Sequence, residues 1–344
     1  MAKLKVWASI DIHTPLAQVG QIARRAEAMG VDCITVADMS HDGLLAAGFA
    51  LQATERVPVA TSALVCFPRS PMTVAVAAWD LQAYSGGRFR LGLGPLVPPN
   101  IIQKYSTPWF PAAPRMREYL ASLRAIFACW QDGVPLNYKG RYYQFTRQQD
   151  FAKPAPITHP HIPVHFAAVG PYMTRLAGEA ADALFAHPTN TSPRFIREVM
   201  RPNITLGAAR SGRSPDDVMI IASPLFATGA NTEEVARQRE AHRTLLATIF
   251  STPNYWPSLE LYGWRDRGEL LKRMVREGNW SGMSAILTDE MLDTFVPAAD
   301  FSGIADLLLE QYDGLAQAIT VHMPADDRHD AEWSRVIAGL QGRA

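Results

Sequence analysis

Cysteine, net charge and long apolar runs are what this sequence has little of. Its 344 residues include three cysteines, and Lys plus Arg equals Asp plus Glu at 33 each. The cysteines are far apart inside apolar stretches, which favours buried reduced thiols over a disulfide framework or a metal site. The charges are interleaved, so no basic stripe indicates a nucleic-acid partner. No stretch approaches the length of a membrane span, and the apolar run at the start is too short for the hydrophobic region of a signal peptide. We therefore expect a cytoplasmic protein with no membrane partner.

What the sequence does have is apolar material in a repeating order. Apolar residues make up 48% of the chain and charged residues 19%, which is enough for a large packed core. Short β-rich runs alternate with longer helical patterns, and the strands are apolar throughout. Such units predict a parallel sheet, and eight of them predict an α/β protein with a closed (β/α)8 TIM barrel. We expect a single domain over residues 1–344, with an irregular loop and hairpin at 94–150 and extra helices at about 232–298.

The carboxyl ends of the predicted strands are where the chemistry of such a barrel lies, because only those loops meet at one mouth. Asp38 and His41 follow the second strand, and His187 follows the sixth. His41 and Asp42 would suit an acid/base pair, but a His next to an Asp is more often solvated or caps a helix. A catalytic histidine needs a pKa near the working pH and a substrate within reach. The sequence leaves both readings open.

The turn after the fifth strand carries a second kind of signal. It reads Val169, Gly170, Pro171, Tyr172 and Met173. A Gly-Pro pair between a buried strand and a helix leaves the amides of Tyr172 and Met173 free at a positive helix end, and Gly170 allows close approach. This geometry suits a phosphate group. A tight turn without any ligand is the alternative, and the sequence does not decide between them.

Several longer runs resemble one known family. These are 69–73 (RSPMT), 85–94 (SGGRFRLGLG), the block from 115 to 133, and 167–178 (AAVGPYMTRLAG). Together they resemble the luciferase-like monooxygenase superfamily, and in particular its branch of coenzyme F420-dependent oxidoreductases. The resemblance is collinear over nearly the whole chain. It implies a bacterial luciferase-like barrel.

The resemblance also implies roles for particular residues. Family members have a non-prolyl cis peptide in a bulge on the third strand, which supports the ring of the coenzyme, and the matching bond here joins Ser62 and Ala63. The turn after the fifth strand matches the coenzyme phosphate site of the family. Asp38 and Asn100 match positions that contact the ring or the reactants.

Three positions depart from the patterns of well-known family members. Sugar-phosphate dehydrogenases of this group have a His and a Glu where this chain has Met39 and Val97, which argues against that substrate class. Bacterial luciferase has an Arg that helps to hold the flavin phosphate, and Pro95 stands there instead. This difference favours a deazaflavin over FMN.

The resulting hypothesis is hydride transfer between coenzyme F420, a deazaflavin, and a small organic substrate that lies above its ring. The proton donor would be Asp38, His41 or His187, with Asp38 favoured. One alternative is a reduced-FMN monooxygenase supplied by a separate flavin reductase, and another is a non-catalytic flavin-binding protein. Relatives are often dimers, so a homodimer is a further expectation.

Overall fold

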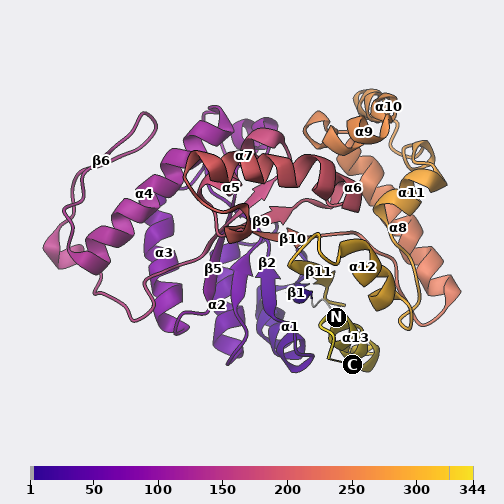
Figure 1. Cartoon of the computed structure of the whole chain (residues 1–344), viewed down its shortest axis with the longest axis horizontal. Coiled ribbons are helices and arrows are strands. Elements are labelled where there is room, and N and C mark those ends of the chain that lie inside the picture. The colour runs from indigo at the N-terminus through magenta and orange to yellow at the C-terminus, as the bar shows by residue number, and fades with distance from the viewer. Residues whose placement is uncertain (1–3, 325, 344) are drawn as a thin grey trace.

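The computed structural model, which describes residues 4–324 and 326–343, is built around a closed barrel of parallel strands. Figure 1 shows the strands at the centre, surrounded by helices. The first strand pairs with the last, and the third pairs with both its neighbours, so the ring has no open edge. The predicted (β/α)8 barrel is confirmed. Its strands are β1 (Lys5–Ser9), β2 (Cys33–Val36), β3 (Val59–Thr61) continued by β4 (Leu64–Val65), β5 (Phe89–Gly94), β8 (Val164–Ala168), β9 (Ala183–Ala186), β10 (Met219–Ala222) and β11 (Ala318–His322).

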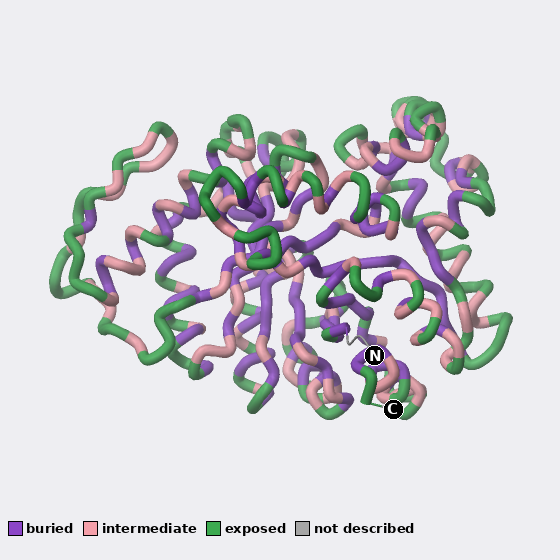
Figure 2. The backbone as a smooth tube through the Cα atoms, viewed as in Figure 1, coloured by how far each residue is buried: buried purple, intermediate pink, exposed green. Residues whose placement is uncertain are grey.

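The strands are buried on both faces, as Figure 2 shows by their purple trace. Their outward side chains pack under the helices in the main hydrophobic core. Their inward side chains fill the barrel, where the ring of Trp7 lies 5.4 Å from that of His165 and 5.6 Å from that of Phe185. The barrel is therefore a packed core and not a pore. The inner apolar cluster consists of Trp7, Cys33, Ala60, Ala183, Phe185, Ile221 and Ala318.

The helices around the barrel begin at residues that suit helix starts. Asp42 accepts hydrogen bonds from the amides of Leu44 and Leu45. It therefore caps a helix, which was one of the two interpretations of the His41-Asp42 pair. Ser70 caps the next helix in the same way, and Pro71 follows it in the first turn. The surrounding helices are α1 (Leu16–Ala28), α2 (Gly43–Ala53), α3 (Pro71–Tyr84), α4 (Ala112–Asp132), α5 (Pro171–Ala180), α6 (Pro193–Phe195), α7 (Arg201–Arg210), α12 (Ile304–Tyr312) and α13 (Asp330–Leu340).

The third strand is interrupted, whereas the sequence predicts one strand over 57–65. The peptide bond between Ser62 and Ala63 is cis, as the resemblance implies, and it separates β3 from β4. The hydroxyl of Thr61 donates to the carbonyl of Gly92 at 2.8 Å and accepts from its amide at 2.9 Å. At the bulge, the side chain of Thr61 therefore makes hydrogen bonds that the backbone makes in a regular strand pair.

A hairpin and a π-helix lie in the long segment after β5. The hairpin, β6 (Tyr138–Lys139) and β7 (Gln144–Phe145), projects away from the barrel beyond α4, at the left of Figure 1. The carboxylate of Glu118 on α4 accepts from the amides of Arg141 and Tyr142, which fixes its tip. The loop before α4 contains the π-helix η1 (Asn100–Lys104), and a 3-10 turn, η2 (Asp150–Ala152), follows the hairpin.

Extra helices between β10 and α12 form a second, smaller core at the right of Figure 1. The sequence extends the seventh strand to Ala227, but β10 ends at Ala222, and Ala227 forms an isolated bridge with Ala298 that joins the two ends of the insertion. No helix of the described residues is long and apolar enough to span a bilayer. The insertion comprises α8 (Thr232–Phe250), η6 (Pro253–Tyr255), α9 (Pro257–Tyr262), α10 (Arg265–Arg276), η7 (Ser284–Ile286) and α11 (Asp289–Phe295).

The outer face of α2 and α3 is unusually apolar for a surface. Leu45 and Phe49 on α2, and Val76 and Tyr84 on α3, are exposed, and Asp80 is the one charged residue of the two helices. A helix that is apolar all round is normally buried. The expected homodimer stays a prediction, and sedimentation of the chain in solution would test whether this face is covered by a second copy.

The first prediction concerns the bulge. A Cβ atom at Gly92 would lie 1.8 Å from the carbonyl oxygen of Thr61, so Gly92→Ala must displace backbone. We expect a loss of about 3 kcal/mol in the free energy of unfolding, measured by urea denaturation. Gly48→Ala is the control, because its Cβ would meet Leu81 at an ordinary 3.6 Å within a helix and should be neutral or stabilising. Equal stability of the two variants would contradict this account of the bulge.

Candidate active site

Small side chains form the part of the mouth between the bulge, β5 and β8. A Cβ atom at Gly94 would lie 3.2 Å from the Cβ of Ala63 and 3.7 Å from that of Ala167, so these three residues are neighbours. The strand register puts Ser9 beside Thr35 and His322, near the mouth on the β1 side. The filled interior lies below them. A flat ligand is therefore best accommodated above this level, against the small residues.

The turn between β8 and α5 keeps its amides free. Gly170 is the N-cap residue of α5, and no side chain caps this helix. Within residues 4–324 and 326–343, the amides of Tyr172 and Met173 donate to no acceptor. A Cβ atom at Gly170 would meet nothing within 4 Å, so the turn faces open space. Free amides at a positive helix end beside such a space fit an anionic group.

A buried polar segment, residues 189–192, lies next to this turn, and we refer to it as the 189–192 strap. Polar side chains in such numbers are rarely this deep unless they are hydrogen-bonded. Each of the four has a hydrogen bond that joins the strap to another part of the mouth. Its members are Thr189, Asn190, Thr191 and Ser192, which are 0–2% exposed.

Asn190 joins the strap to the turn. Its side-chain nitrogen donates to the carbonyl of Ala168 and to that of Val169, each at 3.1 Å. Its Oδ1 is buried and has no hydrogen-bond partner.

The rest of the strap reaches β10 and the helical insertion. Thr191 accepts from the amide of Ser223, just after β10, at 2.9 Å. The hydroxyl of Tyr262 on α9 donates to Ser192 at 3.0 Å. The strap therefore connects the turn, the end of β10 and the insertion.

His187 stands at the end of β9 with its orientation fixed on both sides. Its Nδ1 accepts from the amide of Thr189 at 3.3 Å and lies 2.8 Å from the hydroxyl of that residue. Its ring stacks on Tyr255 of the insertion, with centroids 4.4 Å apart and planes at 20°. Burial lowers the pKa of His187 to about 4. The ring is therefore neutral at pH 7 and, because Nδ1 accepts, carries its proton on Nε2.

Asp38 is engaged entirely by the protein. It is 4% exposed, and its Oδ1 accepts from the amide of Gly43 at 3.0 Å while its Oδ2 accepts from that of Val65 at 2.9 Å. Arg69 donates to both oxygens, at 3.1 and 2.7 Å. Arg69 also binds Asp42 at 2.9 Å. This carboxylate joins β2, α2 and β4, which is a structural task, and its role as proton donor stays a prediction.

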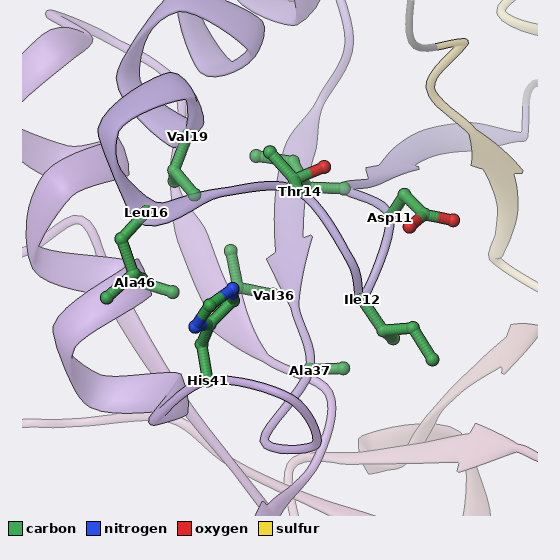
Figure 3. Close-up of a pocket in the computed structure, with 10 residues that line it drawn as sticks. Asp11, Ile12, Thr14, Leu16, Val19, Val36, Ala37, His41 and Ala46 are labelled. Atoms are coloured by element: carbon green, nitrogen blue, oxygen red, sulfur yellow. The ribbon is translucent and has the colours of Figure 1, made fainter.

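Within the described residues, His41 and Asn100 form no hydrogen bond or ring contact with His187. Figure 3 shows the ring of His41 turned toward Leu16 and Ala46, in a small recess between α1 and α2. Asn100 is the exposed first residue of the π-helix η1. The proposed catalytic and binding roles of these two residues stay predictions.

Buried polar atoms without a hydrogen-bond partner lie both at the mouth and in the barrel below it. Besides Asn190 Oδ1, the buried atoms without a partner include Thr35 Oγ1, His165 Nδ1 and Ser223 Oγ. Burial and the charge of Arg90 lower the pKa of His165 to about 3, so its ring is neutral. Buried polar groups normally have partners, so hydroxyl groups or waters are expected beside these atoms.

Little in the sequence indicates the strap. Four small polar residues follow His187 and Pro188, and that run is the one visible signal. Their burial depends on β8, β10 and the insertion, which are distant in sequence. The stacking of Tyr255 on His187 is equally long-range, at 68 residues (255 − 187).

Comparison with known proteins agrees with this architecture. A family model described as luciferase-like monooxygenase matches residues 2–318. An uncharacterized protein of Mycobacterium tuberculosis is 38% identical over 309 residues, which cover 90% of this chain and 91% of that protein. The 5,10-methylenetetrahydromethanopterin reductase of Archaeoglobus fulgidus is 28% identical over 256 residues, covering 72% and 70%. The structure of the coenzyme F420-dependent tetrahydromethanopterin reductase from Methanopyrus kandleri superimposes with a TM-score of 0.80 at 20% identity, covering 99% and 98%.

The chain belongs to the luciferase-like monooxygenase family. Its homologues include proteins described as oxidoreductases.

The second prediction separates the two partners of Arg69. Asp38→Asn leaves a buried guanidinium with a weaker partner, and we expect a loss of about 3 kcal/mol in unfolding free energy. Asp42→Asn is the matched control, because its ion pair is more exposed and Asn also caps helices, so the loss should stay below about 1 kcal/mol. Urea denaturation of both variants measures the difference. Similar losses would mean that Asp38 is not the buried anchor.

The third prediction uses the pKa of His187. Because burial lowers this pKa to about 4, the unfolded chain, with a histidine pKa of about 6.5, binds the proton first as the pH falls. The stability due to the neutral ring is therefore complete above about pH 6.5 and is lost between that pH and about pH 4. We expect His187→Gln to reduce the loss of stability between pH 7.5 and 5 by roughly 1 kcal/mol, since the half-buried ring is partly screened by solvent.

Urea denaturation at the two pH values measures this effect. His13→Gln is the control, because His13 is exposed and should leave the difference between the two pH values unchanged. An unchanged pH dependence in His187→Gln would show that the ring is not held neutral by the fold.

Proposed function

We propose that the chain is an oxidoreductase that transfers a hydride between a deazaflavin of the coenzyme F420 type and a small organic substrate at the barrel mouth. The observation that carries the proposal is the β8–α5 turn, where the amides of Tyr172 and Met173 are free and Gly170 faces open space. A phosphate needs such donors, and the uncapped first turn of a helix supplies them.

The residues at the mouth fit such a coenzyme. The turn amides would hold its phosphate, and Ala63, Gly94 and Ala167 would lie along the ring because they leave room for a flat group. The orphaned oxygens of Asn190 and Ser223 suit the hydroxyls of a polyol chain. A bound deazaflavin supplies the carbon that accepts or gives the hydride.

His187 is the residue that we assign to the substrate. Its Nδ1 is engaged with Thr189, and its Nε2 is not among the buried atoms without a partner. A neutral ring in this state offers one fixed N–H donor, which would orient and polarise a carbonyl or hydroxyl oxygen. Asp38 is already tied to Arg69, and His41 points into its recess, so neither is placed as well for this task.

The choice of a deazaflavin over FMN rests on the coenzyme named for two similar proteins and on the residue that follows β5. The similar reductase from Methanopyrus kandleri is described as coenzyme F420-dependent. A putative F420-dependent oxidoreductase of Mycobacterium tuberculosis also matches 93% of the chain, at 26% identity. Pro95, which directly follows β5, provides no cation for a flavin phosphate. The family also includes monooxygenases, so a reduced-FMN monooxygenase is the alternative that the experiment must distinguish.

The fourth prediction tests the coenzyme and its phosphate site together. Fluorescence titration with oxidised and reduced F420 and with FMN should give the tightest binding for F420. Gly170→Leu should fold with unchanged stability, because its backbone has an ordinary φ of −90° and its Cβ would meet nothing. Its side chain would occupy the open space, so we expect at least an approximately tenfold loss of affinity.

Gly170→Ala is the matched control, since one methyl group should leave most of the space free. Tight binding of FMN alone, together with oxygen uptake by the reduced complex, would favour the monooxygenase. Unchanged F420 affinity in a folded Gly170→Leu variant would show that the phosphate does not lie at this turn.

A further inference from the structure

The proposed function gives a role to the side-chain oxygen of Asn190 but none to its side-chain nitrogen. It is 1% exposed, although an asparagine amide has four hydrogen-bonding positions to satisfy. Its side-chain NH2 group donates to two consecutive carbonyls, those of Ala168 and Val169. These are the last residues before Gly170, so the amide holds the start of the turn.

The two bonds decide which way the turn faces. A peptide carbonyl and the following amide lie in one plane, so fixing the carbonyls of Ala168 and Val169 also fixes the peptide planes that lead into Gly170. The first turn of α5 then has little freedom to rotate its amides. Thr174 supports the other side, with its amide and hydroxyl both donating to the carbonyl of Gly170.

The other end of the Asn190 side chain points to a ligand. Its Oδ1 is buried and has no hydrogen-bond partner in the described chain. The nitrogen assignment is secure, because the two contacts are with carbonyl oxygens, which only accept. An unpaired buried acceptor is unfavourable, so a donor is expected to complete it. The hydroxyls of a ribityl chain, between a flavin-type ring and its phosphate, are donors of the right kind.

We propose that Asn190 is a positioning residue of the coenzyme site: it holds the β8–α5 turn in the conformation that binds a phosphate and accepts a hydrogen bond from the adjoining polyol. Through it, the protein distinguishes phosphorylated ring coenzymes from their phosphate-free forms. The inference rests on the proposed function only in placing a phosphate at this turn, and it applies to F420 and FMN alike.

The strap provides a matched control for this role. Thr191 is 2% exposed and uses its side chain to accept from the amide of Ser223, away from the turn. Thr191→Val removes a buried acceptor without changing the shape of the side chain. Asn190→Leu likewise keeps the approximate volume and adds no charge that could repel a phosphate. The two variants should lose comparable stability, but only Asn190→Leu should alter the turn.

The experiment compares ligands that differ in the phosphate. Dissociation constants for FMN and riboflavin, and for F420 and its phosphate-free ribityl deazaflavin, are measured by fluorescence titration for the wild type and both variants. We expect the wild type to prefer the phosphorylated member of at least one pair. Asn190→Leu should reduce that preference about tenfold, whereas Thr191→Val should retain it. The ratio within a pair is informative because a merely destabilised protein would lose affinity for both members equally.

The outcomes separate the two proposals. If the wild type shows no preference for the phosphorylated member of either pair, the phosphate does not lie at this turn, and both proposals fail. If the wild type shows the preference and folded Asn190→Leu retains it, the role of Asn190 alone is overturned. Should Asn190→Leu fail to fold, Asn190→Ser, which keeps one hydroxyl donor, takes its place, and the same ratio decides.

Discussion

The packing of Trp7, His165 and Phe185 inside the barrel decides where a ligand can lie. Parallel strands bring all their carboxyl ends to one edge, and a filled interior leaves no passage below that edge. The loops above the strands must therefore create the site. The cis bulge after Thr61 and the small residues around Gly94 belong to this layer, and so does the turn at Gly170. Each of them depends on the solid floor beneath.

Buried polar side chains hold the loops of the mouth in place. Asp38 joins three segments through one carboxylate, and Asn190 holds two carbonyls. Buried polar and charged groups add little net stability, because the cost of removing them from water offsets much of the gain from their hydrogen bonds. What they provide is a defined geometry, since an alternative loop conformation would leave a buried charge or amide unpaired. Surface ion pairs, such as Arg194 with Glu198, impose no comparable constraint.

The sequence predicts the parts of the structure that depend on local pattern. The sequence predicts helices over 71–84 and 304–312 and a strand over 318–322, and α3, α12 and β11 have these bounds because each lies between clear turn signals. The cis bond after Ser62 is predicted from the family resemblance alone, because no local pattern in the sequence indicates it. The sequence does not predict which partners individual side chains contact in the fold. Asp38 and His187 follow strands in similar ways, yet one is tied to an arginine 31 residues away and the other stacks on a ring from the insertion.

The charge at the mouth follows from the same burial. Desolvation lowers the pKa values of His187, His165 and His322, so these rings carry no charge at pH 7. The proposed hydride transfer would need the two reactants to be oriented and polarised. A phosphate does need compensation, and at Gly170 the free amides at the start of α5 are suited to provide it. Fixed dipoles attract an anion at short range without the geometric freedom of a lysine or arginine side chain. On the proposed function, coenzyme affinity would depend on how the turn is held, and the residues behind the turn would matter as much as the amides themselves.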